Sequence, residues 1–217
     1  MPTKGIMVAI EETPKKCFAS ALDWPGWSRA GKDPDAAIGA LQDYTPRYAL
    51  IVEAAGLDLP SRITMVEHER LPGGATTAFG APEVTFAADR ERVTPAVANK
   101  MSALLTAAWG YLDAVAAESP AELRKGPRGG GRDRDKMLDH VLEAEANYAR
   151  KLGLRLKPPA RDDLAAIEEQ RLAIAAVIGA ASDGGPVQEN GWTTRYAARR
   201  IAWHVLDHAW EMEDKRP

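Results

Sequence analysis

The sequence has few of the features that mark secreted, membrane or nucleic-acid-binding proteins. Its 217 residues include one cysteine, Cys17, so no internal disulfide can form, and this fits a reducing cytoplasm. The net charge is −3, so bulk electrostatics do not favour nucleic acid. No window reaches the ~18 apolar residues that a membrane helix needs, and the N-terminus lacks the apolar core of a signal peptide. We therefore expect a cytoplasmic protein with no nucleic-acid partner and no membrane contact.

The composition is that of a folded chain. Near residue 90 the sequence pattern changes from short strand-like runs to long helical segments. Hydrophobic residues make up 45% of the sequence, enough for a sizeable core in one large or two small domains. In residues 1–90, one helix is expected to begin near Asp33 and end near Gly56, with Pro46 dividing it near Tyr44. Short β-type runs predict strands, and a loop rich in glycine and proline separates the last two. The predicted strands cover 5–12, 16–24, 63–70 and 83–88, and the loop covers 71–82.

Residues 91–217 are predicted to be helical. Thr94 and Thr193 suit the N-caps of the first and last helices. Breaks rich in glycine and proline separate the segments. The expected architecture is therefore α+β, a small N-terminal αβ domain followed by an up-and-down four-helix bundle. The four helices are expected at about 94–118, 135–152, 162–181 and 193–213.

Three of the four histidines form a two-plus-one pattern that suits a metal ion. His204 and His208 are four residues apart in a helical run, so both imidazoles project from one face, one turn apart. His140 lies in another predicted helix, and antiparallel packing would bring all three rings together. Three neutral imidazoles with an open fourth position are typical of a catalytic site. The alternative is that these are three unrelated surface or interhelix histidines.

These residues also carry a family resemblance. The segments HVLEAEANYA and RRIAWHVLDHAWEMED resemble the second and last helices of DinB/YfiT-like four-helix-bundle proteins, and the resemblance covers about residues 92–217. It implies that His140, His204 and His208 bind a divalent cation, usually nickel or zinc, together with a water. Some family members are thiol-dependent S-transferases that use mycothiol or bacillithiol, and others are isomerases. A thiol cosubstrate is therefore implied as well.

The N-terminal part has a resemblance of its own. KCFASALDWPGWSRAGKDPDAAIGALQDYTPRYA is similar to HicB-like antitoxin domains, and the resemblance covers about residues 5–55. Such antitoxins often add a DNA-binding segment, and none is recognisable in this chain. Toxin neutralisation and operator binding are therefore not expected. The domain is expected to serve as a cap on the bundle or as a homodimer interface.

Glu145 is the candidate catalytic residue, because it falls near the middle of the apolar arc of its helix. There it would act as a general base or support the metal ligands. The favoured alternative is a buried ion pair with an arginine of another helix, for example Arg195 or Arg199, since buried carboxylates are usually paired. Asp207 and Glu211 are each able to orient an imidazole, but a solvated helix face is the favoured interpretation for both.

The run PRGGGRDRD at 127–135 combines glycines, arginines and the start of a helix, which are groups that can hold an anion. It matches no phosphate-binding motif, so a flexible interhelix loop is favoured. Cys17 is expected to be a buried strand residue without a nucleophilic role.

Three functional hypotheses follow. The first is a metalloenzyme for a small-molecule substrate, which transfers a low-molecular-weight thiol or performs metal-assisted hydrolysis. The second is a non-catalytic module in which the HicB-like part binds a protein partner. The third is a bundle whose metal is structural or vestigial.

Overall fold

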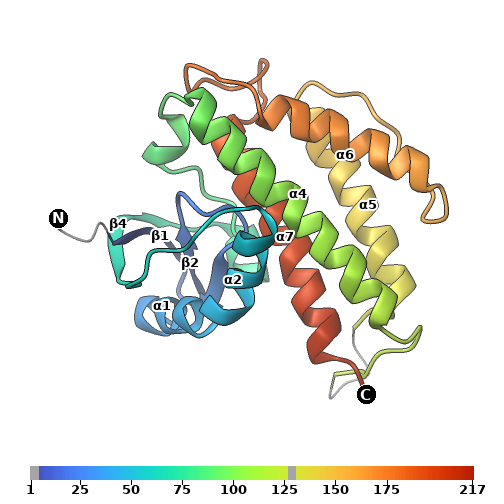
Figure 1. The fold of residues 1–217 in the computed structure, drawn as a ribbon. Coiled ribbons are helices and arrows are strands. Elements are labelled where there is room, and N and C mark those ends of the chain that lie inside the picture. Colours follow the sequence, from blue (N-terminus) through green and yellow to red (C-terminus); the bar gives the residue numbers. More distant parts are fainter. Residues whose placement is uncertain (1–4, 127–130) are drawn as a thin grey trace.

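The computed structural model describes residues 5–126 and 131–217, and its architecture is α+β (Figure 1). A mixed four-stranded sheet lies beside a group of long helices. The strands are β1 Ile6–Glu12, β2 Cys17–Ala21, β3 Ser28–Gly31 and β4 Met65–Pro72. The helices are α1 Pro34–Asp43, α2 Thr45–Ala54, α3 Ala75–Phe79, the 3-10 turn η1 Ala87–Arg90, α4 Pro95–Glu118, α5 Arg134–Lys151, α6 Leu164–Ile178 and α7 Thr194–Asp214.

The sheet has the order β3-β2-β1-β4, with β1 antiparallel to β2 and parallel to β4. Side chains alternate between the two faces of a strand, and β1 is buried on both. Ile6, Val8 and Ile10 join the main hydrophobic core. Ala9 lies on the opposite face, in a small cluster with Phe86. The segment that carries Phe86 therefore covers the second face of the sheet.

The division of the N-terminal helix is confirmed. The Asp33 side chain accepts a hydrogen bond from the Ala36 amide at 2.8 Å and so caps α1. Tyr44 ends α1 and precedes α2, where Pro46 occupies the first turn. Proline tolerates that position because the first-turn amides of a helix have no partner within the helix.

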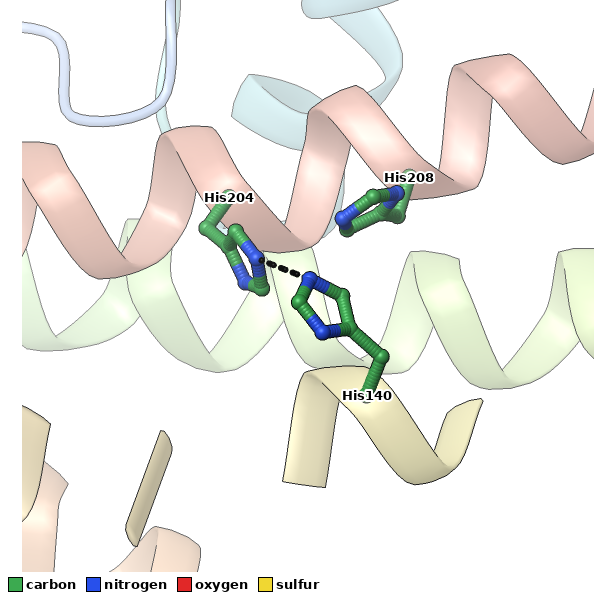
Figure 2. A group of neighbouring side chains, drawn as sticks. All are labelled: His140, His204 and His208. Atoms are coloured by element: carbon green, nitrogen blue, oxygen red, sulfur yellow. Dashed lines mark hydrogen bonds between the residues drawn. The ribbon is translucent and has the colours of Figure 1, made fainter. Parts of the chain in front are cut away.

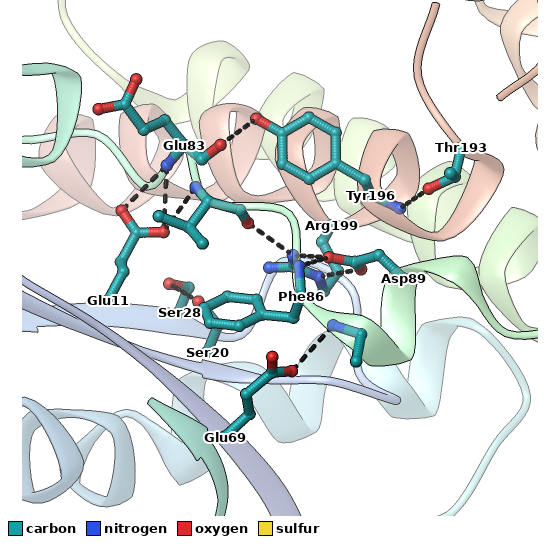
Figure 3. Close-up of polar contacts among 12 residues, drawn as sticks. Glu11, Ser20, Ser28, Glu69, Glu83, Phe86, Asp89, Thr193, Tyr196 and Arg199 are labelled. Atoms are coloured by element: carbon teal, nitrogen blue, oxygen red, sulfur yellow. Dashed lines mark hydrogen bonds and ion pairs between the residues drawn. The ribbon is translucent and has the colours of Figure 1, made fainter. Parts of the chain in front are cut away.

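The strand predicted at 83–88 is wrong, because acidic side chains bind the backbone amides of this segment (Figure 3). The Glu11 carboxylate accepts hydrogen bonds from the amides of Glu83 and Val84 at 2.9–3.1 Å. The amide of Phe86 donates to Asp89 at 2.9 Å. With these donors already satisfied by side chains, the segment crosses the sheet without pairing to a strand.

Three other features differ from the expectation: an additional strand, the content of one loop and the length of one helix. β3 was not expected, and it pairs antiparallel with β2 after the tight turn DWPGW. The loop expected at 71–82 contains the end of β4 and the short α3. α6 is shorter than 162–181, because Asp163 caps its first turn by accepting from the Ala166 amide at 3.0 Å.

Helix α7 packs against α4, α5 and α6, and most of its residues are buried. Its other side meets the turn between β2 and β3 at Gly26 (φ +93°), where a Cβ would lie 2.7 Å from Leu206 Cδ1. Only glycine allows this close approach together with positive φ. A single hydrophobic core includes residues of the sheet, α1, α2 and the four long helices. The domain boundary near residue 90 stays a prediction. Within the described residues, no helix has the length and apolar character to cross a membrane.

Candidate metal centre

The predicted convergence of the histidines is present between α5 and α7. His140 extends from α5 toward His204 and His208, which lie one turn apart on α7 (Figure 2). The ring centroids of His140 lie 5.1 Å from those of both other histidines, and the His204 and His208 centroids lie 4.7 Å apart. One ligand nitrogen from each ring lies within 4.8 Å of the other two. The role of these three residues as metal ligands stays a prediction.

The spacing of the nitrogens suits a small divalent cation. Zn–N bonds of ~2.0–2.1 Å in a tetrahedral site place two ligand nitrogens about 3.3 Å apart. The Nε2 atoms of His140 and His204 lie 3.2 Å apart. Without a cation, one of these atoms must donate its proton to the other, whereas a cation would accept both lone pairs. The donor set is therefore compatible with zinc or nickel.

The environment keeps two of the imidazoles neutral, which is the form that binds metals. Burial, reinforced by the charges of Arg132 and His208, lowers the pKa of His140 to about 4. Burial and then the neighbouring imidazoles hold the pKa of His204 well below its usual range. Both rings therefore present lone pairs at neutral pH.

Glu211 fixes the orientation of His208, so the solvated-face interpretation is wrong for this residue. His208 Nδ1 lies 3.1 Å from Glu211 Oε2. The hydrogen bond from His208, together with Lys215, lowers the pKa of Glu211 to about 2. An ionised carboxylate only accepts, so Nδ1 carries the proton and Nε2 keeps its lone pair for a metal. Asp207 is also paired, with Arg29 at 2.9 Å.

Glu145 is fully buried but lies away from the histidine rings, against α4 and α6. Its Oε1 accepts from Trp109 Nε1 at 2.6 Å, and its Oε2 lies 3.4 Å from Gln170 Nε2. The nearest guanidinium belongs to Arg171, at 3.9 Å. Glu145 therefore faces an arginine of another helix, as the favoured alternative predicted, but this arginine is Arg171 of α6. The examples Arg195 and Arg199 are wrong. Arg195 lies near Asp23 and Glu91, and Arg199 pairs with Asp89.

Two further side chains lie in the seam between α5 and α7, and sequence reasoning did not single them out as site residues. Tyr148 is two turns beyond His140 on α5, and its ring centroid lies 5.6 Å from that of His204. Arg200 is one turn before His204 on α7, and its guanidinium lies 5.6 Å from the Tyr148 ring. Their helical spacing from the histidines is the signal that could have found them.

Of the remaining sequence candidates, Arg132 of the predicted anion loop acts on this centre through its charge, which adds to the effect of burial in lowering the pKa of His140 and His204. Residues 127–130 of the predicted anion loop lie outside the described residues. Arg134 begins α5 and bonds the Ser119 carbonyl at 2.9 Å and Asp135 at 2.8 Å. Cys17 is buried in β2, as expected.

Comparisons with known proteins found no match to this chain among protein-family models, curated proteins or solved structures.

Proposed function

We propose that this protein is a divalent-metal-dependent enzyme whose metal ligands are His140, His204 and His208. The observation that carries the proposal is the convergence of three imidazole nitrogens within 4.8 Å from two separate helices. Three histidines leave one coordination position for a water or substrate, as in catalytic zinc sites. A cation held there supplies Lewis acidity, which lowers the pKa of a bound water or thiol.

The chain's own residues prepare the site for that ligand. Burial keeps His140 and His204 neutral. Glu211 holds the His208 ring with Nε2 available. A carboxylate that accepts from a ligand histidine is typical of metal centres and raises the basicity of the imidazole.

The helical part is proposed to be a DinB-like four-helix bundle, formed by α4, α5, α6 and α7. Support comes from the placement of one histidine on the second of these helices and two on the fourth. By this resemblance, the reaction is transfer of a low-molecular-weight thiol to an electrophile, or metal-assisted hydrolysis. The N-terminal part is proposed to be HicB-like, because two antiparallel strands, the tight turn DWPGW and a third short strand precede its first helix.

Metal analysis of wild type, His204→Ala and His68→Ala tests the metal centre. The full chain is purified without an affinity tag, and bound metal is measured by elemental analysis. Wild type is expected to bind about one divalent ion per chain, and His204→Ala is expected to lose it. His68→Ala is the matched control, since His68 is exposed on β4. At a free metal concentration of 100 times Kd, binding is expected to stabilise wild type by about 2.7 kcal/mol.

Equal metal content and equal metal-dependent thermal shifts in wild type and His204→Ala would overturn the proposal. A metal-free wild type that copurifies with a stoichiometric protein partner would favour the binding-module alternative. If metal binds as expected, a thiol-transfer assay with low-molecular-weight thiols and an electrophile then separates transfer from hydrolysis.

A further inference from the structure

One turn of α7 carries three buried nitrogen atoms that have no hydrogen-bond partner among the described residues. They are Arg200 Nη1, Trp203 Nε1 and His204 Nδ1. Trp203 and His204 are more than nine-tenths buried, with exposed fractions of 4% and 7%. A buried donor without a partner is costly, so such a group usually meets an acceptor from water or a ligand.

All three atoms are donors when the proposed metal is bound. Arginine and tryptophan side-chain nitrogens only donate. His204 would use Nε2 for the metal, which leaves the proton on Nδ1. Metal-bound histidines almost always donate this proton to an acceptor. The turn of α7 that carries His204 therefore presents three donors and no acceptor among these atoms.

The guanidinium of Arg200 also has no carboxylate partner within residues 5–126 and 131–217. It lies 4.9 Å from the Trp203 ring centroid and 5.6 Å from the Tyr148 ring centroid, and its charge and hydrogen bond at the Tyr148 hydroxyl oppose the rise that burial causes in the Tyr148 pKa. Both rings also lie close to His204, at 6.2 Å and 5.6 Å between centroids. Arg200 and His204 therefore both lie next to the rings of Tyr148 and Trp203.

We propose that Arg200 binds a carboxylate group of the substrate next to the metal, with Tyr148 and Trp203 as the walls of that subsite. This proposal rests on the proposed function and names the substrate class of the same site. A guanidinium edge matches a planar carboxylate in two parallel hydrogen bonds. Aromatic walls suit a flat group better than a tetrahedral phosphate.

The subsite is expected to open along the seam between α5 and α7. A small cavity beside Arg200 and Trp203, on the side of the sheet, has a volume of about 10 Å³. This is room for one water, which is too little for an organic anion. The substrate would therefore approach from the side of Tyr148 and the histidines.

Titration of the cobalt-loaded full chain with sodium acetate tests this assignment, with acetamide as the uncharged analogue and inorganic phosphate as the tetrahedral one. The readouts are the visible absorption of the cobalt ion and tryptophan fluorescence. Acetate is expected to bind more tightly than either analogue. Arg200→Gln is expected to weaken acetate binding about tenfold or more, because a charge-assisted pair is lost. Arg200→Lys keeps the positive charge but cannot form two parallel hydrogen bonds, so its acetate affinity should lie between those of wild type and Arg200→Gln. Arg150→Gln is the matched control, since Arg150 is exposed on α5.

Acetate affinity that is equal in wild type, Arg200→Gln and Arg200→Lys would overturn the proposal, as would equal affinity for acetamide or tighter binding of phosphate. Cobalt affinity in the Arg200 variants is expected to stay within about threefold of wild type, which shows that the metal centre is intact. The proposed function fails separately, if wild type binds no metal. In that case acetate-dependent fluorescence of the metal-free protein, with and without Arg200→Gln, still tests the carboxylate subsite.

Discussion

Arg199 and Arg200 are consecutive residues of α7, and they have opposite surroundings. Arg199 is buried, and its Nε and Nη2 atoms donate to the two oxygens of Asp89 at 2.8 Å and 2.5 Å (Figure 3). The Asp89 carboxylate also accepts from the amide of Phe86. Arg200 meets two aromatic rings and, within the described residues, no carboxylate. One arginine is fully paired within the protein, and the other keeps hydrogen-bonding capacity for a ligand.

The two arginines separate the buried polar groups that hold the fold together from those that are available to bind a ligand. On the side of α7 that faces the sheet, Arg199 and Asp89 pair with each other and, together with Glu11 of β1, fix the segment 83–90 between α7 and the sheet. On the side that faces α5, the imidazoles converge, and Arg200 Nη1 and His204 Nδ1 have no partner within the described residues. We expect substitutions on the first side to change stability, and substitutions on the second side to change ligand binding.

The largest effect is expected from Arg199→Ala. Removal of one partner leaves Asp89 buried without its counter-charge, which costs about 3–5 kcal/mol in the free energy of unfolding. For a chain of this size, the melting temperature should fall by roughly 6–20 °C. Thermal and urea denaturation of the metal-free protein measure both quantities.

The double variant Asp89→Leu with Arg199→Met separates the effect of the ion pair from the effect of side-chain packing, because it removes both charges and keeps side chains of similar size. Replacement of both charges by apolar groups should recover part of the lost stability, because neither charge then remains buried alone, whereas the Phe86 amide loses its acceptor. A melting temperature of Arg199→Ala within about 2 °C of wild type would contradict the structural role of this pair.

A smaller effect, on metal affinity, is expected from Glu211→Gln. The amide no longer fixes the proton on His208 Nδ1, and loss of such a partner typically weakens metal binding 10–100-fold, about 1.4–2.7 kcal/mol. Competition with a chromophoric chelator measures the dissociation constant.

Glu213→Gln is the matched control for that change, since Glu213 lies two residues further along α7 and accepts from Tyr111 at 2.8 Å. Equal metal affinity of Glu211→Gln and wild type would mean that His208 is oriented by its packing alone. The contrast between the two sides of α7 would then be weaker than the geometry indicates.

The sequence predicted the histidine convergence because helical spacing is local information. Residues four apart on a helix share a face, so His204 and His208 had to lie together once α7 formed. The pairing with His140 needed only antiparallel packing of two amphipathic helices. The partners of Glu145 could not be found in this way, because Trp109 and Gln170 belong to other helices whose rotation the sequence does not specify.

The same limit explains the errors in the N-terminal part. The run 83–88 has the composition of a strand. Its amides, however, donate to the side chains of Glu11, which is distant in sequence, and Asp89, and not to the backbone of a neighbouring strand. Strand propensity describes a fit to a half-buried surface, and Phe86 does lie on such a surface. Helix boundaries were more predictable, since Asp33 and Thr94 cap their helices through contacts a few residues away.

The smallest effect is expected from Glu145→Gln, in a third buried polar cluster. Glu145 is buried with two hydrogen-bond donors and a guanidinium beyond hydrogen-bond distance, so its pairing is incomplete. Burial raises its pKa, and the effects of Arg171 and Trp109 oppose this rise only in part. Between the usual pKa of about 4.5 and the raised value, the folded protein binds more protons than the unfolded chain. The stability that Glu145 contributes is therefore present at acid pH and is lost as the pH rises through the raised pKa.

Glutamine does not titrate and can still accept from Trp109, so the cost of Glu145→Gln should be under about 1 kcal/mol near pH 4. As the pH rises toward 8, wild type loses stability at this position and the variant does not, so the difference should shift in favour of glutamine. Urea denaturation of wild type and Glu145→Gln at several pH values measures this difference in stability. Gln170→Glu, which places a second carboxylate in the same cluster, is measured for comparison. A difference that does not change with pH would mean that Glu145 keeps its charge through Arg171. The cluster would then belong with Arg199 and Asp89 among the charge pairs that hold the fold together.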